Sequence, residues 1–517
     1  MTSEMRGQLL TGSCGVCAAW MVMMSTRFFA LSLPDIEGAL GIGPDEGSWL
    51  TAGYLAFEPV GVGLGCWLAV IFSLRRIMLL AITLFATSSA IAAMTHDLTL
   101  MILARSGMGL AAGIIIPLAI ITELRTFPPT WRALAIGLYA SAATMAPQAA
   151  ASLDVWLVEH WGTPAIFWIA IPLGMIAFVC GYLGLWRERI RWLLFARADL
   201  RVVTLFSVGA ILLGGGLSQG NRLHWSETPL TLFAVIMGAA LLLGAFWLGG
   251  RRVVHPILMT RLLTRRNALL GALIAIPYQF ASVLSGGLVP AFLVDIPGYR
   301  PEQIAPLLDA AFWPQAVAYP ACIVTLRYGW MEARTFLVLG FGLNALACLL
   351  DLNVTSDWIP DNFVVGQILQ GIGLPWILLP LLMLFVGDVV PSEGLYAAAI
   401  FNVARSLAGT VATAWAATGL RLRAEGRYGE LLASTGLQPH HRTLAAWDGV
   451  NALPWTTPDM VLLDHRARSV VGALVRHQSI VIGFSTLLAD LALMLAATCV
   501  IAACMPPAGA DRPEERS

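Results

Sequence analysis

The sequence contains no lysine, since all 31 of its basic residues are arginine. Catalysis through a lysine amine or a lysine Schiff base is therefore excluded, and several classes of enzyme are excluded with it. The 31 arginines are balanced by 31 acidic residues, so the formal net charge at pH 7 is zero. This balance gives no indication of a nucleic-acid partner.

Charged residues are scarce throughout. Only 12% of the 517 residues are charged and 58% are hydrophobic, against about 25% and about 45–50% in an ordinary soluble domain. We count fourteen apolar runs near the length of about 20 residues that a helix needs to cross the hydrocarbon core. These runs are too long and too uniformly apolar for barrel strands, so they predict helices. The predicted fold class is an all-α polytopic membrane protein with fourteen transmembrane helices.

The arginines of the short loops indicate an orientation. Sixteen of them fall in alternate loops between the apolar runs, whereas the other set of short loops holds only Arg222 and Arg300. Arginine accumulates on the cytoplasmic side of membrane proteins. An even number of spans and this asymmetry both predict a multi-pass inner-membrane protein with both termini in the cytoplasm.

Cysteine and histidine provide no sign of chemistry. The eight cysteines lie in apolar stretches, and Cys14-x-x-Cys17 has redox spacing without a strand-helix context, so we interpret these thiols as small buried hydrophobes. The eight histidines lie in loops or at segment ends, without a ligand pair on an apolar helix face. With no nucleophile–base pair and no nucleotide-binding loop, we predict no enzyme, no metal, no cofactor and no ATP-driven pump.

The fourth apolar run carries a recognisable motif. It reads Arg105-Ser-Gly-Met-Gly109-Leu-Ala-Ala-Gly113, continues to Pro117, and is followed by a Pro-Pro-x-x-Arg loop that ends at Arg132. This segment resembles the Arg-x-x-x-Gly helix and adjoining loop of major facilitator superfamily transporters. The thirteenth run gives a second match.

In that run, Asn402-Val-Ala-Arg405-Ser-Leu-Ala-Gly409 resembles an Asn-x-x-Arg-x-x-x-Gly element of the fourteen-span, EmrB/QacA-type drug:proton antiporters, and the EmrB type is the most similar. The resemblance implies two six-helix bundles, residues 1–190 and 256–517, with two extra helices inserted at residues 191–255. It also implies a long periplasmic connection, residues 421–479. Alternating access would come from rocking of one bundle against the other.

What the resemblance implies for function is export of drugs or fatty acids in exchange for protons. Such exporters work with a periplasmic membrane-fusion adaptor and an outer-membrane channel. Their first helix carries an acidic residue, whereas this chain has Ser25 and Ala30 with Arg27 between them, and the glycine-rich signature of the fifth helix is replaced by residues 150–155. An acid elsewhere would then have to carry the proton.

Five ionisable residues lie deep within the apolar runs, and such residues are functional candidates by default: Arg27, Glu58, Arg105, Asp309 and Arg405. Our main hypothesis is that Glu58 is the proton carrier and is tuned by Arg27 or Arg105. The alternative is a permanent ion pair that holds the first, second and fourth helices together. Asp309 is a second carrier candidate, or else a solvated residue near the outer side.

A set of aromatic, amide and thioether residues is predicted to line an amphiphile-binding cavity. Each of them has the alternative of facing lipid or packing between helices. The set is Phe57, Tyr139, Met145, Gln148, Tyr278, Gln279, Phe312, Trp313, Gln315, Trp376 and Arg405. The motif residues with a structural role are Gly109, Gly113, Pro117, Asn402 and Gly409.

The predicted function is export of hydrophobic or amphiphilic compounds by proton antiport. One alternative is an exporter or facilitator of an anionic metabolite with altered coupling, in which Arg27, Arg105 and Arg405 bind the anion. Another is a flippase or a polytopic membrane enzyme. Residues 421–479 either contact an adaptor or serve as a spacer, and residues 462–475 have the spacing of an amphipathic helix for a membrane surface or a partner.

Overall fold

The computed structural model describes residues 3–128, 131–196, 199–225, 228–252, 262, 265–296, 298–387, 393–434 and 460–504. Throughout these residues the regular structure is helical, and no strand occurs in them. Thirteen helices within the described part are long and apolar enough to cross a membrane. The predicted all-α polytopic fold is confirmed.

The first group of helices packs mainly within itself. Its members are α1 (Ser3–Leu31), α2 (Leu33–Leu40), α3 (Pro44–Phe72), α4 (Leu74–Met94), α5 (Leu98–Thr126), α6 (Arg132–Trp161), α7 (Ala165–Trp168) and α8 (Ala170–Gly184). Helix α5 lies at the centre, against α1, α3 and α4. Helix α6 corresponds to the fifth predicted span and is 30 residues long, but it is not among the thirteen. It is rich in small and polar residues, and many of them are buried against neighbouring helices.

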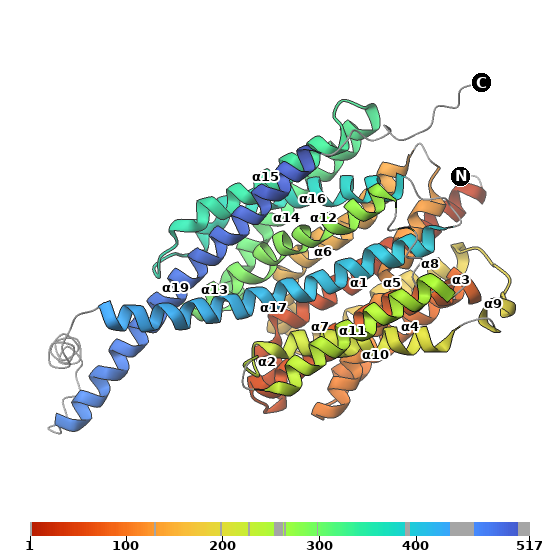
Figure 1. Ribbon diagram of the computed structural model, residues 1–517. Helices are drawn as coiled ribbons and strands as arrows, with labels where there is room; N and C mark the ends of the chain where they lie inside the picture. The colour runs from red at the N-terminus through yellow and green to blue at the C-terminus, as the bar shows by residue number, and fades with distance from the viewer. Residues whose placement is uncertain are drawn as a thin grey trace.

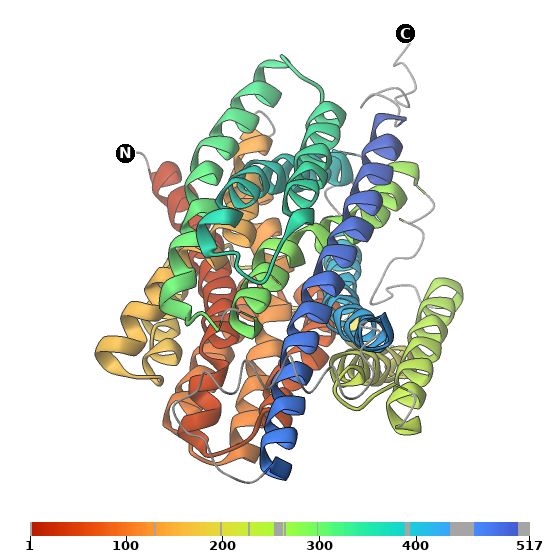
Figure 2. The same ribbon diagram turned by 90° about the vertical axis from the view of Figure 1, so that its left-hand side faces the viewer.

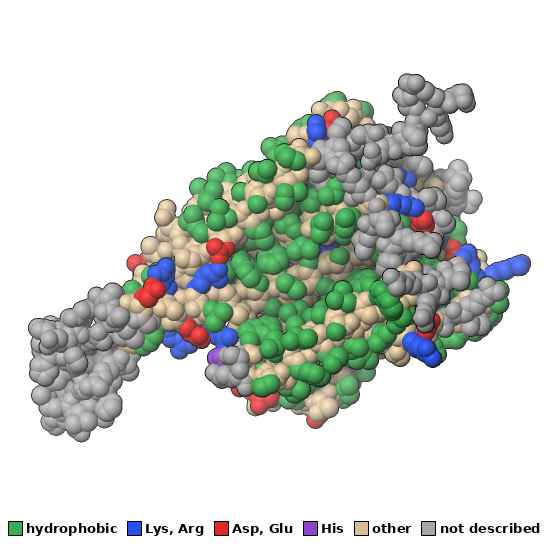
Figure 3. All heavy atoms as spheres, viewed as in Figure 1, with side chains coloured by type: hydrophobic (Ala, Val, Ile, Leu, Met, Phe, Trp, Pro, Cys, Tyr) green, Lys and Arg blue, Asp and Glu red, His purple; other side chains and the backbone are tan. Residues whose placement is uncertain are grey.

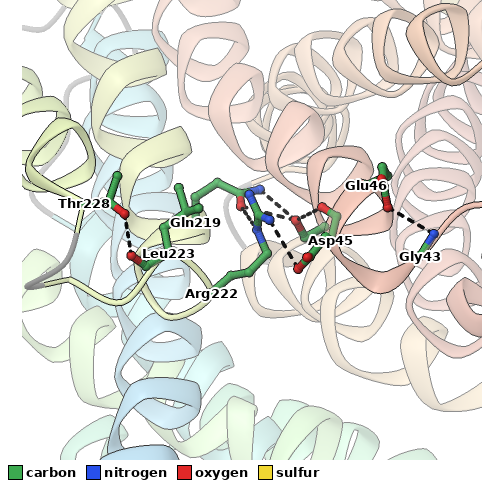
Figure 4. Close-up of polar contacts among 8 residues, drawn as sticks. Gly43, Asp45, Glu46, Gln219, Arg222, Leu223 and Thr228 are labelled. Atoms are coloured by element: carbon green, nitrogen blue, oxygen red, sulfur yellow. Dashed lines mark hydrogen bonds and ion pairs between the residues drawn. The ribbon is translucent and has the colours of Figure 1, made fainter.

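A short helix, α9 (Trp192–Ala196), leads to two further long helices, α10 (Leu200–Gly220) and α11 (Pro229–Arg252). Helix α10 packs against α3 and α11, and Figure 2 shows α11 at the edge of the molecule. Near α2, Arg222 lies 3.3 Å from Asp45 at the start of α3, and its Nε donates to Gln219 over 2.8 Å (Figure 4). The predicted boundary after residue 255 falls outside the described residues.

The second group contains one interrupted helix and two very long ones. Its members are α12 (Arg266–Val283), η3 (Leu284–Leu288), α13 (Val289–Asp295), α14 (Pro301–Tyr328), α15 (Ala333–Leu350), η4 (Asp351–Asn353), η5 (Pro360–Phe363), α16 (Val364–Gly387), α17 (Gly394–Ser434) and α19 (Met460–Ala503). Segment η3 is a π-helix that joins α12 to α13. Such wide turns interrupt helices at functional positions.

Helices α17 and α19 extend past the other helices at one end of the molecule (Figure 1). They contain 41 and 44 residues, which corresponds to lengths of about 60 Å and about 65 Å at 1.5 Å per residue. Within the predicted connection over residues 421–479, residues 421–434 and 460–479 are helical and belong to α17 and α19. The predicted helix over residues 462–475 is confirmed as part of α19, and residues 435–459 lie outside the described part.

The first turn of α1 and the last turn of α19 lie at the same end of the molecule, which we call the terminal end (Figure 1). Helix α2 lies at the other end, which we call the α2 end. Figure 3 shows a surface that is largely hydrophobic, with charged side chains gathered toward the two ends. Large exposed side chains such as Leu243, Trp247 and Leu493 belong to this surface. An apolar belt between two polar ends is what a lipid environment requires.

Candidate functional site

A polar cluster lies where α3, α6 and α17 meet. We call Tyr54, Glu58, Tyr139, Asn402 and Arg405 the central cluster. The Arg405 Nε donates to Asn402 Oδ1 over 3.3 Å, and the Tyr139 hydroxyl donates to the same oxygen over 3.2 Å. The Asn402 amide nitrogen donates to the carbonyl of Ala398 over 2.9 Å. The amide is thus held from both sides, and it fixes Arg405 and Tyr139 relative to each other.

Glu58 faces this arrangement from α3. Its charged neighbour is Arg405, and its polar neighbour on the same helix is Ser406. None of the ion pairs within 4.0 Å in the described residues includes Glu58. The residue as a whole has intermediate exposure, but its carboxyl group lies among the packed helices. The arrangement differs from the prediction, in which Arg27 or Arg105 was the partner, because α17 rather than α1 or α5 faces this side of α3.

The glycine motif of α5 sets the position of α3. A Cβ on Gly109 would lie 2.3 Å from the Tyr54 carbonyl oxygen, and one on Gly113 would lie 2.0 Å from the Glu58 carbonyl oxygen. Only glycine permits backbones to approach so closely. Pro117 is buried one turn further along the same helix. The two motif glycines therefore press directly against the backbone of the two central-cluster residues of α3.

Arg105 contacts Tyr54 of the central cluster and makes cation–π contacts with two aromatic rings. Its guanidinium carbon is 3.6 Å from the ring centroid of Phe29 and 4.7 Å from that of Tyr54. The residue is only 2% exposed, and its Nε and Nη1 have no hydrogen-bond partner among the described residues. Cation–π contacts of this kind are strongest where water is excluded. The Tyr54 hydroxyl in turn lies 3.0 Å from the Thr26 hydroxyl.

Arg27 is directed away from Glu58. Its Nη1 donates to the carbonyl of Gly286 in the π-helical segment η3, so the side chain connects α1 to the second group of helices. Its charged neighbour is Asp154 of α6, which accepts hydrogen bonds from the Ser32 hydroxyl at 2.9 and 3.1 Å. The Arg27 Nε and Nη2 have no hydrogen-bond partner in the described part of the chain.

Helices α6 and α14 are joined by hydrogen bonds between the two groups of helices. Nearest the α2 end, the Ser152 hydroxyl donates to Asp309. Further down, the Tyr319 hydroxyl donates to the Ala140 carbonyl and also lies 2.7 Å from the Thr144 hydroxyl. The predicted residues Gln148 and Gln315 lie between these two sets of hydrogen bonds.

Both of these glutamines are buried, and Gln315 is fully buried. The Gln148 Oε1 and both polar atoms of the Gln315 amide have no hydrogen-bond partner in the residues that the structure describes. Buried polar atoms without partners are rare in folded proteins and call for an explanation such as a ligand or water. This interface between the two groups is therefore polar and incompletely satisfied.

The remaining predicted cavity residues divide into inner and outer positions. Tyr278 is buried and is electrostatically coupled to Arg405 and Tyr139, which places it beside the central cluster. Gln279 lies against Gly409, where an added Cβ would be 2.6 Å from its amide nitrogen. The Trp376 indole nitrogen is buried without a partner. Phe57, Met145 and Phe312 are partly buried.

Trp313 is the exception, because it is 69% exposed. It lies in line with Val317 and Val324, which are also exposed and follow at helical spacing on α14. The packed face of that helix is the opposite one. The structure therefore places Trp313 on the outer surface of the bundle rather than with the cavity residues.

Sequence reasoning missed Tyr54 and Tyr319. Each is one helical turn from a residue that was chosen: Tyr54 precedes Glu58 by four positions, and Tyr319 follows Gln315 by four. Residues four apart on a helix share a face, so this spacing was the available signal. Among the described residues no group of three or more His, Cys, Asp or Glu is placed to hold a metal ion.

The fold and the charged cluster between two helical groups define a multi-pass membrane transporter. Residues 15–299 match the sequence profile of the Major Facilitator Superfamily, which is more than half of the chain, and the protein belongs to this family. Known solved structures share the fold. They include the human organic anion transporter MFSD10 (TM-score 0.55, 12% identity, 96% of this chain and 100% of that one) and a proton-dependent oligopeptide transporter (TM-score 0.59, 13% identity, 97% and 98%).

Relatives in sequence are resistance transporters. The probable multidrug resistance protein EmrY of Escherichia coli (strain K12) is 26% identical over 411 residues, which cover 77% of each chain. The multidrug export protein EmrB of Haemophilus influenzae is 23% identical over 428 residues, again 77% of each chain. The fatty acid resistance protein FarB of Neisseria gonorrhoeae is 25% identical over 405 residues, which cover 76% of this chain and 77% of that one.

Proposed function

We propose that this transporter exports hydrophobic or amphiphilic compounds from the cytoplasm in exchange for protons, with Glu58 as the proton carrier. The observation that carries the proposal is the position of Glu58, whose carboxyl lies among the packed helices and faces Arg405 across the two groups of helices, without an ion pair within 4.0 Å in the described residues. A carboxyl in this position can lose its proton to water on one side and regain it on the other. The Arg405 charge stabilises the ionised state.

The environment of the central cluster supports an amphiphilic cargo. Tyr54, Tyr139, Tyr278 and Tyr319 provide buried rings with hydroxyl groups from four different helices. Aromatic surfaces with a few polar groups suit bulky apolar molecules that carry one polar end. The printed names of the relatives, which refer to multidrug export and fatty acid resistance, agree with this class of cargo.

We also propose that the α2 end faces the periplasm of the inner membrane and that both termini are cytoplasmic. The arginine asymmetry of the short loops supports this orientation. The projecting parts of α17 and α19 would then extend from the membrane surface, where they offer a binding site for a periplasmic adaptor. Cross-linking from residues 421–434 in intact cells tests this; capture of no periplasmic protein would contradict it.

The coupling proposal is tested in proteoliposomes with a fluorescent amphiphile. Glu58→Gln is expected to retain exchange of internal for external substrate and to lose the uptake driven by an imposed pH gradient, because the amide cannot ionise. Glu302→Gln is the matched control, since Glu302 is exposed at the start of α14. Glu58→Gln protein that still couples transport to the pH gradient would refute the assignment.

A second candidate function is the export of an anionic metabolite. The buried nitrogens of Arg27 and Arg105 that have no hydrogen-bond partner among the described residues favour it, because guanidinium groups with free donors are suited to bind an anion. The two candidates differ in their response to substrate charge. Transport that requires a carboxylate on the cargo, and that disappears in Arg105→Met, would favour the anionic cargo over a neutral or cationic amphiphile.

A further inference from the structure

A large cavity lies apart from the central cluster, at the α2 end of the molecule. It has a volume of about 1450 Å³ and is lined by residues of α12, η3, α13, α17 and α19 and of the loop between α10 and α11. Pockets for drug-sized ligands measure about 300–1,000 Å³. The cavity is thus larger than a small drug requires, and all of its lining residues belong to the described part of the chain.

The lining of the cavity includes both apolar and charged residues. One part is apolar and is formed by residues such as Val283, Leu288, Leu420 and Ile480. The rim carries both signs of charge: Arg421 and Arg476 are the cations, and Asp295 and Glu425 are the anions. Figure 3 shows charged side chains of both signs on the surface where α17 leaves the hydrophobic belt. An apolar wall with a rim of mixed charge matches an amphiphile that carries both a phosphate and an ammonium group.

The loop between α10 and α11 forms one side of this cavity, which Asn221 and His224 line. His224 has a φ of 46°, a left-handed conformation that is uncommon for a residue other than glycine. In this conformation its Nδ1 accepts a hydrogen bond from Nη1 of Arg421. The neighbouring Trp225 donates from its indole nitrogen to the Thr418 hydroxyl over 2.9 Å. Two side chains of the loop thus fix it to α17.

Polar atoms at the rim still lack partners. Within the part of the chain that the structure describes, the Arg421 Nε and the Asn221 Oδ1 are buried without a hydrogen bond, although both residues line the cavity. The Arg421 Nε is 3.9 Å from Glu425, too far for a hydrogen bond. A guanidinium with a free donor, in a cavity that a second arginine also lines, can bind an oxyanion such as a phosphate.

We propose that this cavity binds a zwitterionic phospholipid, with its acyl chains along the apolar wall and its head group at the charged rim. The phosphate lies against Arg421 and Arg476, and the ammonium group lies against Asp295 and Glu425. The loop between α10 and α11 completes the site, which gives these two helices a role in lipid binding. The site is separate from the central cluster, so the proposal does not depend on the mechanism of transport.

The test uses the full-length protein in liposomes that contain phosphatidylethanolamine with a photoreactive acyl chain. Cross-linked peptides identified by mass spectrometry are expected to map to residues 283–295, 413–428 and 472–480. Ala417 is exposed within the cavity, so Ala417→Trp should fill the space and lower the labelling about tenfold. Ala321→Trp, at an exposed position of α14 outside the cavity, is the steric control.

The head-group contacts are tested in the same assay. The double variant Arg421→Gln, Arg476→Gln should lower labelling by phosphatidylethanolamine about tenfold. Arg300→Gln, an exposed arginine at the same end of the molecule, should leave it unchanged. Elution of each variant as a single species in size-exclusion chromatography, together with substrate exchange at the central cluster, controls for folding. Equal labelling of this cavity by photoreactive phosphatidylglycerol, or labelling unaffected by Ala417→Trp, would overturn the proposal.

Discussion

The substitution Gly113→Ala tests how α5 positions the proton-carrier candidate. An alanine Cβ at this position would lie 2.0 Å from the Glu58 carbonyl oxygen, and the nearest ordinary contact is 3.4 Å. The two helices must therefore separate locally by about 1.4 Å. The clashing atom belongs to the backbone, so no change of rotamer can relieve the contact. Overpacking of this kind costs about 1–3 kcal/mol.

The separation also moves Glu58 relative to Arg405, because the displaced carbonyl belongs to Glu58 itself. We expect Gly113→Ala to lower the thermal unfolding midpoint in detergent and to weaken uptake driven by a pH gradient more than it weakens substrate exchange. Gly342→Ala is the matched control, since nothing lies within 4 Å of the added Cβ there. If the two alanine variants have equal stability and equal coupling, the argument from helix contact is incorrect.

Three further predictions follow from the contacts of the site. Arg105→Lys keeps the charge but loses the flat contact with two aromatic rings, so it should destabilise the protein by about 1–2 kcal/mol in thermal unfolding; a neutral result would refute the cation–π assignment. Asn402→Leu and Tyr139→Phe share one hydrogen bond, so their effects on substrate affinity should be less than additive in a double-mutant cycle. Trp313→Leu should leave the KM for every substrate unchanged, whereas a raised KM would place Trp313 in the substrate path.

The sequence was sufficient to predict the helical architecture, because the length and apolarity of the runs leave no alternative in lipid. It also identified Asn402 and Arg405 from their motif, and the structure places them together. It did not identify Arg405 as the neighbour of Glu58. The two residues are 347 positions apart in the chain, and their proximity depends on how two groups of helices pack rather than on any local pattern.

Other features depended on tertiary structure for similar reasons. A helix was predicted for residues 462–475, which belong to α19, but residues 421–434 of α17 form no long apolar run and were assigned to the connection without a predicted helix. Trp313 was selected for its residue type, whereas its environment follows from which face of α14 packs inward. The partners of Arg27 could not be anticipated, because its acceptor is a backbone carbonyl in an irregular segment.

That last contact has an evolutionary consequence. The acceptor at residue 286 is part of the main chain, and an added Cβ there would lie 3.8 Å from the Arg27 Nη1, which is an ordinary contact. Small side chains can thus replace Gly286 without removing the group to which the guanidinium binds. At position 286 the link between the two groups of helices depends on the main-chain carbonyl and not on the side chain, so homologues that differ at 286 but retain the arginine and the backbone geometry would preserve it.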